Sequence, residues 1–155
     1  MLTSVSIRRA APGDEAILTT FSERVCPALL SHDWSFALDE KNHFIDLAED
    51  DQLFAFVCGG QPEHADVLPD GTGEIFVCLV DAHHRRQGIG RKLMIRAVTV
   101  LKRRGFVGAF MWLPASHDWL IDWATEIGFV ASDYERTGAA LQPERGFLLD
   151  LDLLF

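Results

Sequence analysis

The stretch from residue 81 to residue 94, DAHHRRQGIGRKLM, combines basic side chains with two closely spaced glycines. Arg85 and Arg86 precede Gly88 and Gly90, an apolar run lies before them, and a segment with helical spacing follows. The first amides of a helix lack intrahelical partners and the helix dipole adds about half a positive charge there, so this arrangement can hold a phosphate. It also fits a turn that only packs a helix against a sheet. The spacing alone leaves both interpretations open.

Histidine and cysteine residues give a weaker chemical signal. His83 and His84 are adjacent, so on an extended segment they point in opposite directions, and a solvated loop is a commoner role for them than proton transfer. The three cysteines, Cys26, Cys58 and Cys78, lie far apart, without metal-ligand spacing, and their odd number does not indicate a disulfide framework. We therefore expect no metal site.

The elements that must position these residues are predicted from the spacing of apolar side chains, which indicates one mixed α/β domain over residues 1–155. Strands are expected at 4–9, 53–58, 74–80, 106–113, 130–136 and 147–153, with at most a short one at 65–68. Helices are expected at 11–26, 34–48, from 89 to about 102, and at 116–129. Strand 74–80 is apolar on both faces apart from Glu74, which is typical of a central strand.

Two of these helices have apolar stripes that define an expected inward face. In the helix at 11–26, Ile17, Phe21 and Val25 recur every four residues. In the helix at 116–129 the inward residues are expected to be Trp119, Leu120, Trp123, Ala124 and Ile127.

The bulk composition excludes some classes of function. The chain has 155 residues, is 48% hydrophobic and carries a formal net charge of -9, which argues against a nonspecific nucleic-acid binder and is compatible with a cationic partner. The N-terminus lacks the apolar stretch of a signal peptide, and no run approaches the roughly 18 apolar residues of a membrane span. We expect a cytoplasmic protein without nucleic-acid or membrane partners.

Four motifs in a fixed order resemble the GNAT superfamily of acyl-CoA N-acyltransferases. RRQGIG (85–90) is similar to its Arg/Gln-x-x-Gly-x-Gly/Ala motif, and EIFVCLVDAHH to the strand before it. SIRRAAPGDEAIL resembles the opening strand and helix, and WATEIGF (123–129) the FYEKLGF-type helix ending. The resemblance spans nearly the whole chain. It implies an α/β GNAT fold with a mixed, mostly antiparallel sheet of about six to seven strands, flanked by about four helices.

The resemblance also implies acetyl-CoA as acyl donor, no metal, and direct transfer to an amine within a ternary complex. The backbone of Cys78, Leu79 and Val80 would pair with the pantetheine arm and meet the thioester carbonyl, while Arg85 flanks the phosphates. The pyrophosphate would be held by the backbone amides of Arg86, Gln87, Gly88, Ile89, Gly90 and Arg91.

Glu74 is the candidate general base, because part of the family carries a glutamate base at this position on the same strand. Strand alternation predicts that Glu74 shares a face with Phe76, Cys78 and Val80, and apolar neighbours would raise the pKa of its carboxyl group. The alternative is an exposed residue at the start of a strand without a chemical role.

The general acid is where the chain departs from the family pattern. Ala124 stands where many members carry a tyrosine, and the single tyrosine of the chain, Tyr134, lies beyond the helix. His117 stands where the family often has an asparagine that contacts CoA. Ser116 or His117 could substitute, although we expect Ser116 or Asp118 to cap the helix instead. The group that protonates the leaving thiolate is therefore left open.

These observations favour an acetyl-CoA-dependent N-acetyltransferase that acts on a primary amine of a small molecule or a protein. The resemblance implies that acceptor specificity comes from segments 26–40 and 134–146, and a homodimer is possible by analogy. Trp112, Trp119 and Trp123 could line the acceptor pocket, although they more often belong to a core. The alternatives are an acyl-CoA-binding sensor or interaction module that has lost catalysis, and a chain that binds no CoA at all.

Overall fold

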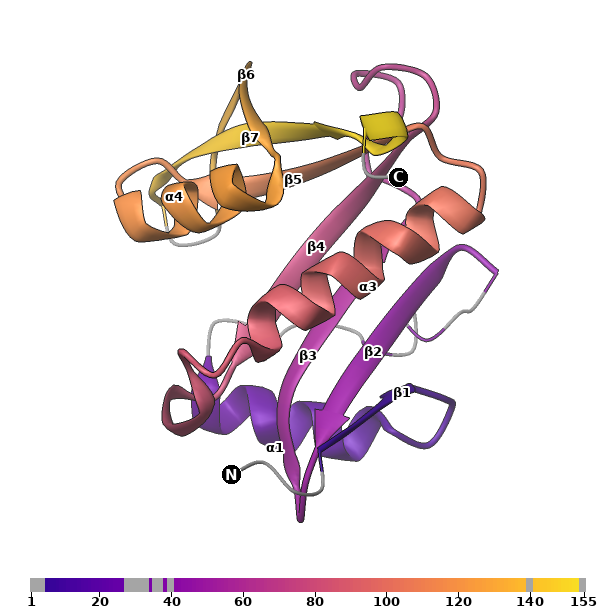
Figure 1. Ribbon diagram of the computed structural model, residues 1–155, viewed down its shortest axis with the longest axis vertical. Helices are drawn as coiled ribbons and strands as arrows, with labels where there is room; N and C mark the ends of the chain where they lie inside the picture. The colour runs from indigo at the N-terminus through magenta and orange to yellow at the C-terminus, as the bar shows by residue number, and fades with distance from the viewer. Residues whose placement is uncertain (1–4, 27–33, 35–37, 39–40, 139–140, 154–155) are drawn as a thin grey trace.

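A single seven-stranded sheet organises the chain, whose computed structural model describes residues 5–26, 34, 38, 41–138 and 141–153 (Figure 1). The strand order is β1-β2-β3-β4-β5-β7-β6. The strands are β1 (Ser6–Arg9), β2 (His43–Glu49), β3 (Leu53–Gly60), β4 (Thr72–Val80), β5 (Gly108–Pro114), β6 (Val130–Thr137) and β7 (Pro143–Asp150). Strands β4 and β5 pair in parallel, and every other neighbouring pair is antiparallel. The expected fold, a mixed and mostly antiparallel sheet, is confirmed.

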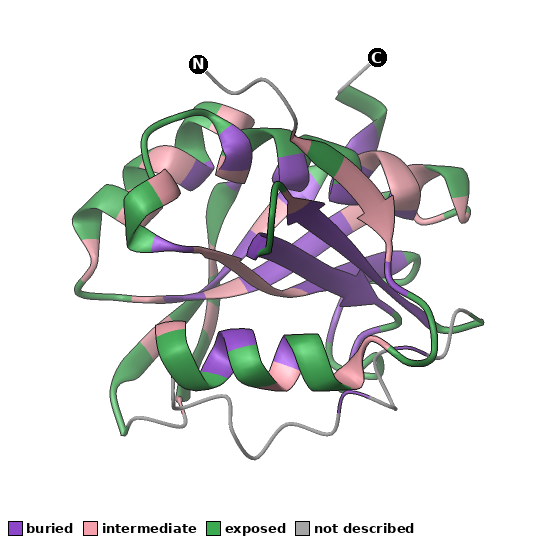
Figure 2. Cartoon of the chain, turned by 90° about the horizontal axis from the view of Figure 1, so that it is seen from below, coloured by how far each residue is buried: buried purple, intermediate pink, exposed green. Residues whose placement is uncertain are grey.

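Helices cover both faces of the sheet (Figure 2). The described residues contain three α-helices and two short 3-10 turns, against about four helices expected: α1 (Glu15–Val25), α3 (Ile89–Arg103), α4 (Asp118–Ile127), η2 (Ala82–His84) and η3 (Leu151–Leu153). One apolar cluster joins α3 and α4 to one face, and a second cluster joins α1 to the other. We call these the α3 face and the α1 face.

The helix expected at 34–48 is wrong over its second half, where the chain forms β2. Residues 43–48 are all buried, because β2 lies between β1 and β3 and is covered on both sides. Sheet pairing overrides a local apolar spacing that fits a helix as well as a strand. Trp34 and Leu38 are buried, and the rest of 34–40 lies outside the described residues.

Two further expectations near the ends of the sheet are corrected. The strand expected at 147–153 begins earlier, as β7, and its last three residues form η3 instead. Residues 65–68 lie in a loop of turns and bends between β3 and β4, without a strand.

Two of the predicted helix stripes are correct in part. Phe21 of α1 and Trp123, Ala124 and Ile127 of α4 pack in the core clusters as expected, whereas a residue at one edge of each stripe does not. In α1 the buried residues are Leu18, Phe21 and Ser22, whereas Ile17 remains 36% exposed. In α4 the fully buried residue is Ala124, whereas Trp119 is 62% exposed. The sheet contacts a narrower arc of each helix than the apolar composition suggests, so an apolar residue at the edge of the stripe remains in solvent.

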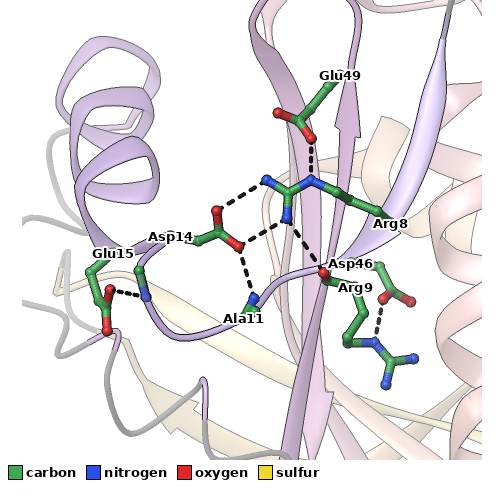
Figure 3. A network of polar contacts seen from close by, with 8 residues as sticks. Arg8, Arg9, Ala11, Asp14, Glu15, Asp46 and Glu49 are labelled. Carbon is green, nitrogen blue, oxygen red and sulfur yellow. Dashed lines mark hydrogen bonds and ion pairs between the residues drawn. The ribbon is translucent and has the colours of Figure 1, made fainter.

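Ion pairs fasten the first strand and helix to the rest of the fold (Figure 3). Arg8 on β1 donates to both oxygens of Asp14, at 2.9 and 3.0 Å, at the start of α1. Asp46 on β2 is fully buried between Arg9, at 2.5 Å, and Arg96 of α3, at 2.9 Å. A buried carboxylate needs such partners, and here they connect β1, β2 and α3.

Candidate active site

The parallel strands β4 and β5 separate after three residues, which creates a gap in the middle of the sheet. Thr72 to Glu74 pair with Gly108 to Phe110, and beyond this point the two strands diverge (Figure 1). The outer half of β4, residues 76–80, is half-buried, and residues 77–80 stay paired with β3 on the other side. Its edge toward β5 therefore offers backbone groups to a ligand that adds as an extra strand.

A bulge in β4 changes which face its side chains occupy. Cys58 of β3 lies opposite Val77, but Gly59 lies opposite Ile75, so Phe76 is an extra residue in the ladder. A side chain at Gly59 would come within 2.9 Å of the Glu74 carbonyl oxygen, so glycine at this position permits the close approach.

The bulge corrects the predicted face of Glu74. Ile75 packs in the cluster under α3, so Glu74 points to the α1 face, where Phe76 also packs. Cys78 and Val80 lie on the α3 face, and Leu79 returns to the α1 face. Glu74 thus shares its face with Phe76 but not with Cys78 and Val80, because simple alternation fails at a bulge.

Glu74 occupies the apex of the gap. It is the last β4 residue paired on both sides, with Gly60 of β3 and Phe110 of β5. It is only 6% exposed, which excludes the interpretation of an exposed strand start. Burial raises the pKa of its carboxyl group to about 7, and a hydrogen bond with the Glu63 backbone and the charge of Arg136 oppose part of this rise. A carboxyl group with this pKa can take up and release a proton near neutral pH.

The loop between β4 and α3 turns sharply and leaves the start of the helix open. Arg86 and Gly88 both adopt positive φ, 65° and 83°, and Gly88 is the N-cap of α3. Residues 85–88 are exposed, whereas the Ile89 side chain is buried, so Ile89 can offer a ligand only its backbone amide. The Arg85 side chain folds back so that its Nε donates to the Val80 carbonyl at 3.3 Å.

The glycines of this loop fit a cradle for phosphate groups. A side chain at Gly88 would point into open space, with no atom within 4 Å, which is where a ligand can approach the helix N-terminus. At Gly90 a Cβ atom would meet Val80 and Trp123 at the ordinary contact distances of 3.5 and 3.7 Å. The residues present therefore fit the pyrophosphate of a CoA molecule.

Side chains on either side of the loop hold its first residues. Asp81 is buried, accepts a hydrogen bond from the His83 amide at 2.9 Å and pairs with Arg24 of α1. These two partners hold the pKa of Asp81 below its usual range. His84 stacks on Phe54 with ring centroids 4.2 Å apart. No local pattern indicates the contact of Asp81 with Arg24, because the two residues lie 57 positions apart along the chain.

The α4 side of the gap lacks a hydroxyl group at the expected position. Ala124 is fully buried, and Tyr134 instead contacts Phe110 on the face of Glu74. The N-cap of α4 is His117, without a side-chain cap, so the expected capping by Ser116 or Asp118 is wrong.

Several other features bound the chemistry. Burial raises the pKa of the Cys78 thiol to about 12, which makes it a poor nucleophile at neutral pH.

Within the described residues no group of three or more His, Cys, Asp or Glu side chains could hold a metal ion. None of the helices in the described part of the chain is long and apolar enough to cross a membrane. A hollow of about 420 Å³ between α4 and strands β6 and β7 has no lining residue from β4 or from the loop 81–91, so it is separate from this site.

The family model that matches this chain is the acetyltransferase (GNAT) family, over residues 14–129. The chain belongs to the GNAT acetyltransferases. The family match confirms the resemblance seen in the sequence motifs. GNAT acetyltransferases move an acyl group to an amine. No curated protein matches this GNAT acetyltransferase in sequence.

Solved structures of other acetyltransferases share the fold of this GNAT chain. The ribosomal-protein-S18-alanine N-acetyltransferase of Escherichia coli is 18% identical with a TM-score of 0.71, covering 95% of this chain and 94% of its own. The PaiA N-acetyltransferase of Thermoplasma acidophilum, solved with coenzyme A, is 13% identical with a TM-score of 0.68, covering 96% and 99%. A Salmonella typhimurium structure with its cofactor acetyl-CoA is 19% identical with a TM-score of 0.73, covering 97% and 95%.

The matched span divides the site of this GNAT acetyltransferase into two parts. It contains Glu74, the loop 81–91 and α4, but it ends before β6 and β7. Tyr134 and Arg136, which lie on β6, therefore belong to the part of the site that the family model does not cover.

Proposed function

We propose that the protein transfers an acetyl group from acetyl-CoA to a primary amine. The observation that carries the proposal is the gap between β4 and β5. It opens directly after the buried carboxyl group of Glu74, and the end of β4 that borders it leads into the glycine turn that begins α3. The reaction requires a place for the thioester donor, a base and an anion cradle, and the gap, Glu74 and the turn would supply them.

The donor would be held mainly by backbone groups. The first amides of α3 and of the turn before it, from Arg86 to Arg91, would donate to the pyrophosphate, with Arg85 and Arg86 supplying positive charge. The edge of Cys78, Leu79 and Val80 that is not paired with β5 would pair with the amides of the pantetheine arm, which would enter the gap as an added strand. Bound acetyl-CoA supplies an activated acyl group whose carbon–sulfur bond breaks during transfer.

Glu74 would remove the proton from the acceptor amine, directly or through a water molecule. An ammonium group cannot attack, and a carboxyl group with a pKa of about 7 is ionised in a useful fraction at neutral pH. The amine nitrogen would then form its bond to the acyl carbon, and the sulfur would leave with the electron pair of the broken bond. The proton taken from the ammonium group would stay on Glu74 until solvent removes it, and the second proton, which the nitrogen loses as the amide forms, would pass through water to the sulfur. Because Ala124 offers no hydroxyl group, the sulfur would be protonated by water.

The second candidate function is an acyl-CoA-binding module without catalysis. The buried Ala124 favours it, since many GNAT acetyltransferases carry a tyrosine at this position and this chain has no hydroxyl group there.

An acceptor screen with thiol release as the readout separates the two functions. A broad panel of primary amines is tested with acetyl-CoA and the wild-type protein, and acetyl-CoA affinity is measured by calorimetry. We expect thiol release with at least one amine, and a Glu74→Gln variant that loses about 100-fold or more in rate while its acetyl-CoA affinity changes little. Tight acetyl-CoA binding without thiol release across the panel would support the binding module instead.

A further inference from the structure

The α1 face of the sheet continues from Glu74 across β5 as a row of aromatic side chains. Phe110, the β5 partner of Glu74, contacts Trp112 with ring centroids 5.0 Å apart and Tyr134 with centroids 5.6 Å apart. The alternate β5 residues, including Met111, pack in the opposite cluster under α3 and α4. Trp112 and Tyr134 are half-buried, so an acceptor whose amine lies at Glu74 has an aromatic surface beside it.

A fixed guanidinium group stands at the far end of this row. Arg136 on β6 lies over the Trp112 ring, with Cζ 4.5 Å from the centroid, and its Nε donates to Glu144 Oε1 at 2.6 Å. The two contacts hold the side chain in place although it remains 41% exposed. Within the described part of the chain the Nε contact is the one hydrogen bond of this side chain, so the two terminal nitrogens are available. A guanidinium group binds a carboxylate with two parallel hydrogen bonds through such nitrogens.

The guanidinium group of Arg136 is also close enough for its charge to oppose the rise in the pKa of the Glu74 carboxyl group. Trp112 is two residues along β5 from Phe110, a distance of about 7 Å. A small acceptor can therefore place its amine at Glu74 and still extend to Arg136.

We propose that the acceptor is an amino acid, whose amine lies beside Glu74 and whose carboxylate pairs with Arg136. This inference rests on the proposed acetyltransferase function and names the class of its acceptor. Arg136 is then a specificity-determining residue that Trp112 and Glu144 hold in position. An acceptor with a neutral group in place of the carboxylate would leave the guanidinium group without a partner. An acceptor with a second ammonium group there would be repelled by the guanidinium group.

The test compares amino acids with their own carboxamides as acceptors, so that the amine stays and the negative charge is removed. Thiol release is measured for wild type, Arg136→Gln, Arg136→Lys and the control Arg145→Gln, at acceptor concentrations that resolve KM from kcat. Arg145 belongs to the neighbouring strand β7 and pairs with Glu135, on the opposite face of the same strand pair. Calorimetric binding of the preferred amino acid in the presence of CoA gives a second readout that needs no turnover.

We expect wild type to prefer amino acids over their carboxamides by about tenfold or more, mostly through KM. Arg136→Gln should abolish this preference and weaken calorimetric binding of the amino acid by the same factor, while the KM for carboxamides and the affinity for acetyl-CoA change little. Arg136→Lys should retain part of the preference, because lysine keeps the positive charge but cannot donate the two parallel hydrogen bonds of a guanidinium group. Arg145→Gln should behave as wild type.

Equal or better use of carboxamides or polyamines by the wild-type protein would overturn the amino-acid acceptor and leave the acetyltransferase function intact. So would an Arg136→Gln variant that slows both acceptor types equally. Absence of thiol release with every amine would instead overturn the acetyltransferase function and, with it, this inference.

Discussion

Arg24 on α1 and Asp81 at the end of β4 form an ion pair that joins the helix of one sheet face to the loop that begins α3. Asp81 is buried and uses its other oxygen to accept from the His83 amide, so one carboxylate fixes both α1 and the first turn of the loop. The start of the loop 81–91 is therefore fixed by a contact with α1, whereas the exposed residues 85–88 take no part in that contact.

Breaking this pair should weaken acetyl-CoA binding without removing a ligand contact. In Asp81→Asn the side chain loses its charge, and we expect acetyl-CoA affinity to fall by about tenfold because the loop amides are less well ordered. Arg24→Met should have the same effect, and the double variant should show little more than either single one, because all three break the same contact. Calorimetry measures the affinities, with the exposed Asp70→Asn as control. Wild-type affinity in a folded Asp81→Asn variant would contradict this role.

The pH dependence of transfer should follow the Glu74 carboxyl group. Because its pKa is about 7, kcat/KM should rise with pH through about 7 and then level off as the base becomes fully ionised. The comparison is with Glu74→Gln and the same acceptor, in which any remaining rise reports the amine of the acceptor. Identical pH profiles for the two proteins would show that another group titrates.

The pH dependence of the free energy of unfolding should also reflect the Glu74 carboxyl group, with stability decreasing as pH rises. The pKa of Glu74 in the folded chain is raised above its ordinary value of 4.5, so between these values the native state binds the proton more tightly than the unfolded chain does. The free energy of unfolding should therefore fall as pH rises from about 4.5 to about 7. Glu74→Gln lacks this loss, and its stability relative to wild type should increase by on the order of 3 kcal/mol between pH 4.5 and pH 9. Chemical denaturation at the two pH values measures the difference.

The two glycines of the turn should respond differently to substitution. Gly88→Val places a side chain where a ligand approaches, at a residue with φ of 83°, and should reduce acetyl-CoA affinity by about 100-fold or more. Gly90→Ala adds a methyl group with ordinary contact distances to its neighbours and should bind nearly as wild type. Equal affinities of Gly88→Val and wild type would place the pyrophosphate elsewhere.

The packing of Phe110 beside Glu74 depends on a glycine in the next strand. A side chain at Gly146 of β7 would overlap the Phe110 ring, so Gly146→Ala should cost about 1–3 kcal/mol of stability. Gly108→Ala on β5 meets its neighbours at 3.5 and 3.6 Å and is the matched control. Urea denaturation of the two variants measures the difference, and equal midpoints would mean that the ring moves away at little cost.

Much of the fold followed from local patterns in the sequence. The apolar spacing from Ile89 onward predicted α3, and the glycines and arginines before it predicted its exposed N-terminal turn. Both depend on hydrogen bonds and backbone angles within a few residues of each other, so the local sequence carries enough information. The expected helix at 34–48 failed over β2 for the opposite reason, since partners far along the chain decided its conformation.

The sequence by itself determined that a strand, a glycine turn and a helix follow one another with Glu74 at the start. Only the tertiary structure decided which way the side chains of that strand point, because the bulge at Phe76 depends on how β4 pairs with β3. It also decided that Arg24 pairs with Asp81 and that Arg136 lies over Trp112, through strand pairing and helix packing between residues that lie far apart along the chain. A linear sequence does not specify these distances, because they arise only when the whole sheet is assembled.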